Sequence, residues 1–163
     1  MKYRIKIITG NIKSGKTTYL QELLSSLENV AGVIQVAEGN RRFFVDLLSG
    51  EKIELTSQNK SSDTFKIGNF IFRKPAFIWA KEKLRDALKS KHKIIAIDEF
   101  GLLELHNEGL EPVFSETINK VKSTTDLKLI IIIRESLLKD FLKKFDLNEN
   151  EVEIEVIKKD VSQ

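Results

Sequence analysis

The sequence predicts an α/β fold, a three-layer sandwich with a mostly parallel sheet, in a single domain over residues 1–163. First, strand-like apolar segments alternate along the chain with segments whose apolar residues recur at helical spacing. Second, residues 93–97 and 129–133 are almost continuously apolar, which is typical of parallel strands covered by helices on both faces. Third, a chain of 163 residues is long enough for one core and too short for two comfortable ones.

The individual elements follow from the same patterns. The expected strands are residues 3–8, 31–36, 42–48, 52–56, 65–72, 93–99, 129–133 and 152–156. The expected helices, each with one apolar stripe, are residues 20–27, 75–88, 110–121 and 137–145. Ser49, Gly50 and Glu51 separate two short strands, which predicts a hairpin that extends the sheet as an antiparallel β-ribbon. Pro75 suits the first turn of its helix.

The composition is that of an ordinary globular protein, with 41% hydrophobic and 31% charged residues. The net charge of +3 is a mild excess, so a nucleic acid partner is possible but not indicated. The absence of cysteine excludes disulfides and cysteine-based metal sites. The chain enters a strand without a signal peptide, and no apolar run approaches bilayer length. We therefore expect a cytoplasmic protein without membrane association. We also expect a monomer, although no sequence pattern reports the oligomeric state.

A phosphate-binding loop is the clearest motif. Residues 10–17 read Gly-Asn-Ile-Lys-Ser-Gly-Lys-Thr, which matches the pattern G-x-x-x-x-G-K-T between a strand and a helix. In this setting backbone N–H groups surround phosphate oxygens at the positive end of the helix dipole. Lys16 is expected to reach the β- and γ-phosphates, and the Thr17 hydroxyl to ligate Mg²⁺. The expected nucleotide-binding residues are Gly10, Asn11, Ile12, Lys13, Ser14, Gly15, Lys16, Thr17 and Thr18.

Two acidic residues at the end of an apolar strand complete the predicted site. Asp98 lies at the carboxyl end of a buried strand, where such sheets bind ligands, and is expected to hold Mg²⁺ opposite Thr17. Glu99 is placed to orient or deprotonate a water that attacks the γ-phosphate. A strand and a helix intervene between the loop strand and the Asp98 strand. This arrangement, with the second acid, resembles the glutamate-containing, RecA-like division of P-loop NTPases.

A more specific resemblance covers residues 2 to about 145. Residues 98–105, Asp-Glu-Phe-Gly-Leu-Leu-Glu-Leu, resemble the D-E-I-G-x-M-E-L signature of a family of small P-loop nucleoside-triphosphatases, first described from thermophiles. Residues 36–48 resemble the family's arginine segment before a β-ribbon, and residues 67–70 its V-G-x-Y step before a long helix. The resemblance implies slow, Mg²⁺-dependent hydrolysis of ATP, GTP and other nucleoside triphosphates. Glu104 matches the second acid of the signature, and we expect it to anchor the Gly101 turn or to join the water network.

The sequence departs from that family in places that concern arginine. The segment after Glu38 is shorter, and the family's usual His-Arg is represented only by Ile133-Arg134. Phosphoryl-transfer sites commonly add an arginine that stabilises the leaving charge. Arg134 is the first candidate for this catalytic role, because it ends a core strand. The next candidates are Arg41, Arg42 and Arg73.

The sequence therefore predicts a Mg²⁺-dependent nucleoside-triphosphatase in which Lys16, Glu99 and Arg134 are catalytic. One alternative is a nucleoside or polynucleotide kinase that uses Glu99 or Asp98 against a substrate hydroxyl. The other is a nucleotide-dependent switch or RNA-binding adaptor. No guanine-reading N-K-x-D motif is present, which argues against a Ras-like switch. The base preference and the physiological substrate have no sequence signature.

Overall fold

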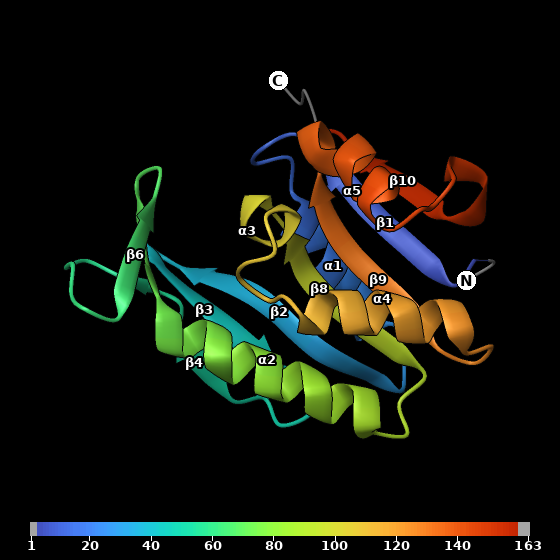
Figure 1. The fold of residues 1–163 in the computed structure, drawn as a ribbon, viewed down its shortest axis with the longest axis horizontal. Coiled ribbons are helices and arrows are strands. Elements are labelled where there is room, and N and C mark those ends of the chain that lie inside the picture. Colours follow the sequence, from blue (N-terminus) through green and yellow to red (C-terminus); the bar gives the residue numbers. More distant parts are fainter. Residues whose placement is uncertain (1–2, 160–163) are drawn as a thin grey trace.

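A seven-stranded sheet with helices on both faces forms the body of the computed structural model, which describes residues 3–159 (Figure 1). The strand order is β10-β1-β9-β8-β2-β3-β4. The strands of this sheet are β1 (Ile5–Gly10), β2 (Val30–Glu38), β3 (Arg41–Asp46), β4 (Lys52–Glu54), β8 (Ile94–Phe100), β9 (Lys128–Arg134) and β10 (Glu153–Ile157). The α-helices are α1 (Lys16–Ser25), α2 (Lys74–Lys89), α3 (Leu102–Leu105), α4 (Val113–Ser123) and α5 (Leu138–Lys144). Short 3₁₀-helices are η1 (Glu135–Leu137) and η2 (Glu149–Glu151).

The five strands from β10 to β2 are parallel, and β3 and β4 add to them antiparallel. β9 lies between the phosphate-loop strand β1 and the strand β8 that carries Asp98. The α/β fold, the mostly parallel sheet and the antiparallel ribbon are thus confirmed. The final strand lies at an edge of the sheet, as its alternating glutamates predict.

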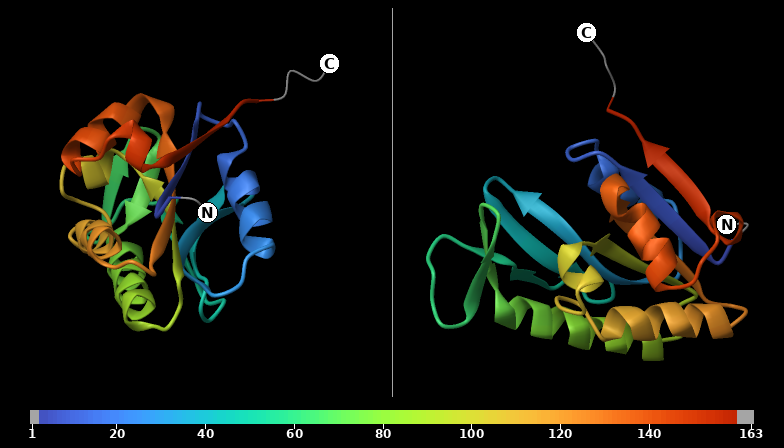
Figure 2. Two further views of the ribbon diagram at one scale, coloured as in Figure 1. Left: turned by 90° about the vertical axis from the view of Figure 1, so that its right-hand side faces the viewer. Right: turned by 45° about the horizontal axis from the view of Figure 1, so that its top comes forward.

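Helices cover the two faces of the sheet unequally. α1 lies alone on one face, and α2, α4 and α5 lie on the other (Figure 2). Under α1, Leu20 packs against strand residues such as Ile8 and Ile132. The larger core on the other face includes a cluster of aromatic rings from Phe100, Phe114, Phe141 and Phe145. Because helices bury both faces, all six residues of β1 are buried, which is why the parallel strands are so apolar.

The prediction of one strand over residues 65–72 is wrong, because this segment is a hairpin. A second sheet, with strand order β5-β7-β6, consists of β5 (Thr56–Ser57), β6 (Thr64–Ile67) and β7 (Phe70–Arg73). Ile67 pairs with Phe70, so the chain reverses over two residues, and Gly68 takes the positive φ of 58° that such a tight turn needs. We call residues 56–73 the arm. It projects from the domain beside the start of α2 (Figure 1).

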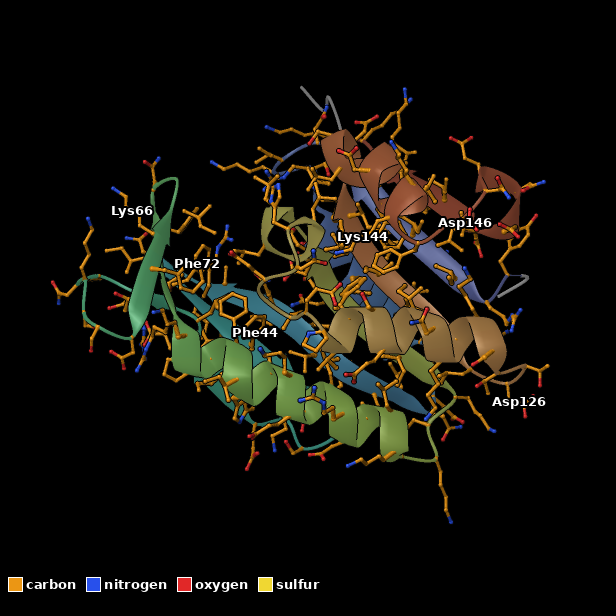
Figure 3. The ribbon with its side chains drawn as sticks, in the orientation of Figure 1. Phe44, Lys66, Phe72, Asp126, Lys144 and Asp146 are labelled. Atoms are coloured by element: carbon orange, nitrogen blue, oxygen red, sulfur yellow. The ribbon has the colours of Figure 1, made fainter. Side chains whose placement is uncertain are left out.

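Aromatic contacts attach the arm to the rest of the domain. The Phe65 and Phe72 rings lie 5.7 Å and 6.1 Å from that of Phe77 on α2. Phe77 in turn contacts Phe44 of β3 at 5.3 Å, ring centre to ring centre. Figure 3 shows Phe72 at the base of the arm and Phe44 on the side of the ribbon that faces α2. The arm and the ribbon therefore share one apolar cluster with the N-terminal half of α2.

The carboxyl ends of the central strands bring the predicted site residues together. Gly10 pairs with Arg134 across β1 and β9, and Asp98 pairs with Ile132 across β8 and β9. Since parallel strands end at the same edge, Gly10, Arg134 and Asp98 lie along one edge of the sheet. Of the helices described, none has the length and hydropathy to cross a membrane.

Candidate active site

The phosphate loop connects β1 to α1, and both of its glycines have positive φ angles that residues with side chains rarely adopt. Gly10 has a φ of 154°, and a Cβ there would lie 2.4 Å from the backbone oxygen of Ile157 on β10. Gly15, directly before α1, has a φ of 90°, and Lys13 a φ of 58°. The N–H of Ser14 donates to the Asn11 oxygen at 3.2 Å, which closes the loop at the N-terminus of α1. These backbone conformations suit an anion-binding loop.

Lys16 lies folded over this loop. Its Nζ donates to the backbone oxygens of Asn11 at 2.7 Å and Gly10 at 3.2 Å, and the residue is only 9% exposed. Burial lowers the pKa of Lys16; the Glu99 carboxylate opposes this, and the Arg134 guanidinium adds to it. Lys16, Glu99 and Arg134 are therefore close enough to interact electrostatically. A positive charge held inside a loop of N–H groups is an attractive site for a phosphate group.

Asp98 and Thr17 form the second part of the site. The Thr17 hydroxyl donates to Asp98 Oδ2 at 3.2 Å, and Asp98 is 2% exposed. Burial raises the pKa of Asp98 to about 7, and the neighbouring Glu99 charge adds to the rise. The hydrogen bonds from Thr17 and from the Gln35 backbone, and the positive charge of Arg42, oppose it. A buried carboxylate beside another acid is poorly compensated, which favours a cation at this position.

A Mg²⁺ ion fits the donors present here. Magnesium prefers oxygen ligands and keeps several waters, and a hydroxyl next to a carboxylate supplies such oxygens. Within residues 3–159 there is no cluster of three or more His, Cys, Asp or Glu residues that could hold a metal. The ion would therefore need phosphate oxygens as further ligands. The buried hydroxyl of Ser14 in the loop also has no hydrogen-bond partner, which is consistent with a site that receives further oxygen atoms.

Glu99 lies where β8 becomes irregular. The register between β8 and β9 shifts between Asp98 and Phe100, so Glu99 is left out of the strand pairing. The Phe100 ring is completely buried in the aromatic cluster, which fixes the backbone on the far side of Glu99. Glu99 itself is partly exposed. The residue predicted to activate water is thus set beside Asp98 and Lys16 on a firmly anchored segment.

Glu104 is a second anchor of this segment, and it lies on helix α3, which the sequence patterns do not predict. Its Oε2 accepts a hydrogen bond from the Gly101 N–H at 3.0 Å, and its Oε1 accepts one from the Leu110 N–H at 3.1 Å. Burial raises the pKa of Glu104, and these two backbone donors oppose the rise. Of the two expectations for Glu104, anchoring of the Gly101 turn is the one that the geometry matches. Lys144 on α5 donates to the Glu104 backbone oxygen and so joins this turn to α5.

The candidate arginines lie in different surroundings. Arg134 ends β9 beside the loop and lines a cavity of about 370 Å³ with Asn11, Ile12 and Ser136. Arg41 donates to both oxygens of Glu54, at 2.9 Å and 2.8 Å. Arg73 lies 4.0 Å from the same carboxylate. Arg134 is therefore next to the loop, while Arg41 and Arg73 are engaged with Glu54.

Two contributors to the site had no signal in the sequence. The Gln35 backbone N–H reaches Asp98 only because β2 lies next to β8, an adjacency that no local pattern reveals. Lys144 reaches the Glu104 turn because α5 packs beside α3. Both contributions depend on tertiary packing between distant segments, and a motif search cannot detect them.

Comparisons with known proteins show the family and the fold of the chain. The model of the NTPase family matches residues 5–161 of the chain. THEP1 from the hyperthermophile Aquifex aeolicus has a similar structure, with a TM-score of 0.69, 19% sequence identity, and coverage of 94% of this chain and 90% of that one. A human cancer-related nucleoside triphosphatase is also similar, with a TM-score of 0.65, 22% identity, and coverage of 96% and 90%. No curated protein matches the sequence.

The family match spans nearly the whole chain, and it includes the loop, the Asp98 strand and the Glu104 turn. The two structural similarities, both under 25% identical, concern the fold. The resemblance to small P-loop nucleoside-triphosphatases is thereby confirmed. This chain belongs to the NTPase family and has a P-loop NTPase fold.

Proposed function

We propose that the protein hydrolyses nucleoside triphosphates, including ATP and GTP, to the diphosphate and inorganic phosphate with Mg²⁺ as cofactor. The observation that carries this proposal is the arrangement of Lys16, Thr17, Asp98 and Glu99. Thr17 and Asp98 are hydrogen-bonded to each other, and both Asp98 and Glu99 lie close enough to Lys16 to influence its pKa. One edge of the sheet thus carries a phosphate binder, a pair of metal ligands and an acid that can act on water.

Each residue has a defined role in this proposal. The loop N–H groups and Lys16 bind the phosphate chain, and Lys16 exchanges its bonds to the loop oxygens for phosphate oxygens. Thr17 and Asp98 would hold Mg²⁺, which supplies positive charge to the β- and γ-phosphates. Glu99 accepts a proton from the attacking water as the oxygen bonds to the γ-phosphorus and the bond to the β-phosphate oxygen breaks. Arg134 stabilises charge at the loop side of the site.

The test is a panel of nucleoside triphosphates with and without Mg²⁺, in which free phosphate is measured. We expect phosphate release that requires Mg²⁺, and a Lys16→Ala variant that loses it by a factor of about 100 or more, since it lacks the cation that binds the transferred group. Release that persists in Lys16→Ala would contradict the assignment of the site.

Two other classes of function give different results in the same experiment. Labelled phosphate that appears in an added nucleoside or nucleic-acid end, and not in solution, would indicate a kinase. Tight nucleotide binding with negligible turnover, together with nucleotide-dependent binding of an RNA or a protein, would indicate a switch.

A further inference from the structure

Arg42 has surroundings that differ from those of the other arginines near the site. It lies on β3, where it pairs with Ala37 of β2. Its guanidinium lies 4.4 Å from the centre of the Phe70 ring on β7 of the arm, a typical cation–π distance. Phe70 is 40% exposed, so a large aromatic ring stays at the surface and covers the guanidinium. Over the range 3–159, no carboxylate forms an ion pair with Arg42.

The neighbouring residue Arg41 makes the contrast clear. Alternation along β3 places Arg41 and Arg42 on opposite faces of the ribbon. Arg41 is neutralised by the two-pronged contact with Glu54 and lies 5.0 Å from the Phe43 ring. Arg42 packs against an aromatic ring and not against a carboxylate. Its positive charge is therefore not neutralised, and its N–H groups can donate to another partner.

Arg42 also lies on the part of the ribbon that is close to Asp98. β2 pairs with β8 only from Val30 to Val33 and then continues with β3 towards the arm (Figure 1). Beyond this pairing, the Gln35 backbone donates to Asp98, and the cross-strand partner of Arg42 is two residues further along β2. The positive charge of Arg42 is near enough to lower the pKa of Asp98.

The order of the strands indicates which part of a nucleotide Arg42 would meet. The loop is at the end of β1, Asp98 is at the end of β8 two strands away, and β3 lies two strands beyond β8. If the loop binds the phosphates of the nucleotide and Asp98 binds the metal ion, the γ-phosphate of the nucleotide points towards β8 and the ribbon. Arg42 lies on that side, whereas Arg134 lies beside Gly10 at the end of β9.

We propose that Arg42 binds the γ-phosphate of the nucleotide and that the Phe70 ring of the arm positions its guanidinium for this contact. The proposal rests on the proposed function, since it requires a triphosphate in this site. Stacking on a ring leaves the in-plane N–H groups of a guanidinium available, and these can bind two phosphate oxygens at once. Phe70 is thus a positioning residue, and the arm becomes part of the nucleotide site.

The test compares the affinities of a non-hydrolysable β,γ-imido triphosphate and of the diphosphate, both with Mg²⁺, by calorimetry. We expect Arg42→Gln to bind the triphosphate analogue about 10- to 100-fold more weakly, because a charge-assisted contact is lost, and to bind the diphosphate as wild type does. Phe70→Leu, which keeps Arg42, should lose about 2- to 10-fold for the triphosphate alone. Arg41→Gln, the matched control on the opposite face, should leave both affinities unchanged.

A double variant separates positioning from general packing. If Phe70 acts through Arg42, adding Phe70→Leu to Arg42→Gln should not lower the affinity for the triphosphate analogue any further. Additive losses, equal losses for both nucleotides, or an unchanged triphosphate affinity in Arg42→Gln would each overturn the proposal. If Arg42→Gln does not fold, Arg42→Lys replaces it. Lysine keeps the positive charge but cannot bind two phosphate oxygens at once, so the triphosphate affinity should still fall in Arg42→Lys and in Phe70→Leu. Because only binding is measured, a wild type that binds the triphosphate but never hydrolyses it would refute the proposed function and leave this inference standing.

Discussion

At the scale of single residues, the site concentrates charges that the folded chain alone compensates poorly. Asp98 is buried next to Glu99, and it accepts hydrogen bonds from the Thr17 hydroxyl and the Gln35 backbone N–H. Lys16 is buried against backbone oxygens. Both residues therefore reduce stability in their charged forms, and both would be stabilised by the magnesium nucleotide that we propose as the ligand. The electrostatic cost of burying these charges is a reason to expect a charged ligand at this site.

The raised pKa of Asp98 predicts how stability without ligand depends on pH. The folded state holds the Asp98 proton up to a pH of about 7, whereas an unfolded aspartate releases it near its ordinary pKa of about 4. Between these values the folded state binds more protons, so stability falls as pH rises. Between about pH 5 and about pH 8, wild type should lose about 2–3 kcal/mol of unfolding free energy relative to Asp98→Asn. Urea unfolding with a metal chelator measures this, and parallel pH profiles for the two proteins would refute it.

Glu104 allows a second prediction at this scale. In Glu104→Gln one of the two acceptor oxygens becomes an NH₂ group that faces the N–H of Gly101 or Leu110. The loss of one buried hydrogen bond should cost about 1–3 kcal/mol of unfolding free energy. Because the Gly101 turn follows Glu99, we also expect a lower kcat with little change in KM. An unchanged kcat at reduced stability would show that Glu104 serves the fold alone.

At the scale of elements, the sequence predicts what is local and misses what is not. The apolar runs predict β8 and β9 because parallel strands are buried on both faces. The same reasoning merges β6 and β7 into one strand, since the Gly68-Asn69 turn interrupts a segment whose residues are β-prone on either side. α3 has only four residues, too few for a helical stripe. The phosphate loop and the acidic pair can be recognised as sequence motifs. The strand order that brings them together in the sheet cannot be recognised in this way.

Gly10 links two elements, and its substitution tests that link. A Cβ at Gly10 would meet the Ile157 oxygen at 2.4 Å, so Gly10→Ala must separate β1 from β10 or distort the loop. We expect a loss of more than about 2 kcal/mol in unfolding free energy and weakened nucleotide binding. Gly50→Ala is the matched control, because Gly50 also has a positive φ, 76°, with no atom within 4 Å of the added Cβ. It should cost about 1 kcal/mol and leave binding unchanged. Equal effects of the two substitutions would contradict the steric argument.

At the scale of the whole molecule, the site depends on elements that come from both ends of the chain. β1 and α1 contribute the loop and Thr17, β8 contributes the acidic pair, β9 contributes Arg134, and β10 holds Gly10 in place. The arm joins the same assembly through the aromatic contacts of Phe65 and Phe72 with α2. A ligand that bridges these parts should therefore stabilise the fold as a unit.

This dependence predicts how thermal stability responds to ligands. Mg²⁺ with a non-hydrolysable triphosphate at about 100 times its Kd should add about 2.7 kcal/mol of stability. Mg²⁺ alone should add little, because the described residues provide no metal cluster of their own. A thermal unfolding series with each component separately checks this. A large stabilisation by Mg²⁺ alone would place the metal at a different site.

Glu99 is the residue that we propose to activate water for attack on a triphosphate held by the loop. The most direct measurement is the comparison of wild type with Glu99→Gln, in which Mg²⁺-dependent triphosphate binding and phosphate release are measured on the same preparations. The amide keeps the shape of the side chain but cannot accept the proton of water. We predict that binding stays within about threefold of wild type, while phosphate release falls by a factor of about 100 or more. Release at the full wild-type rate by Glu99→Gln would contradict the claim.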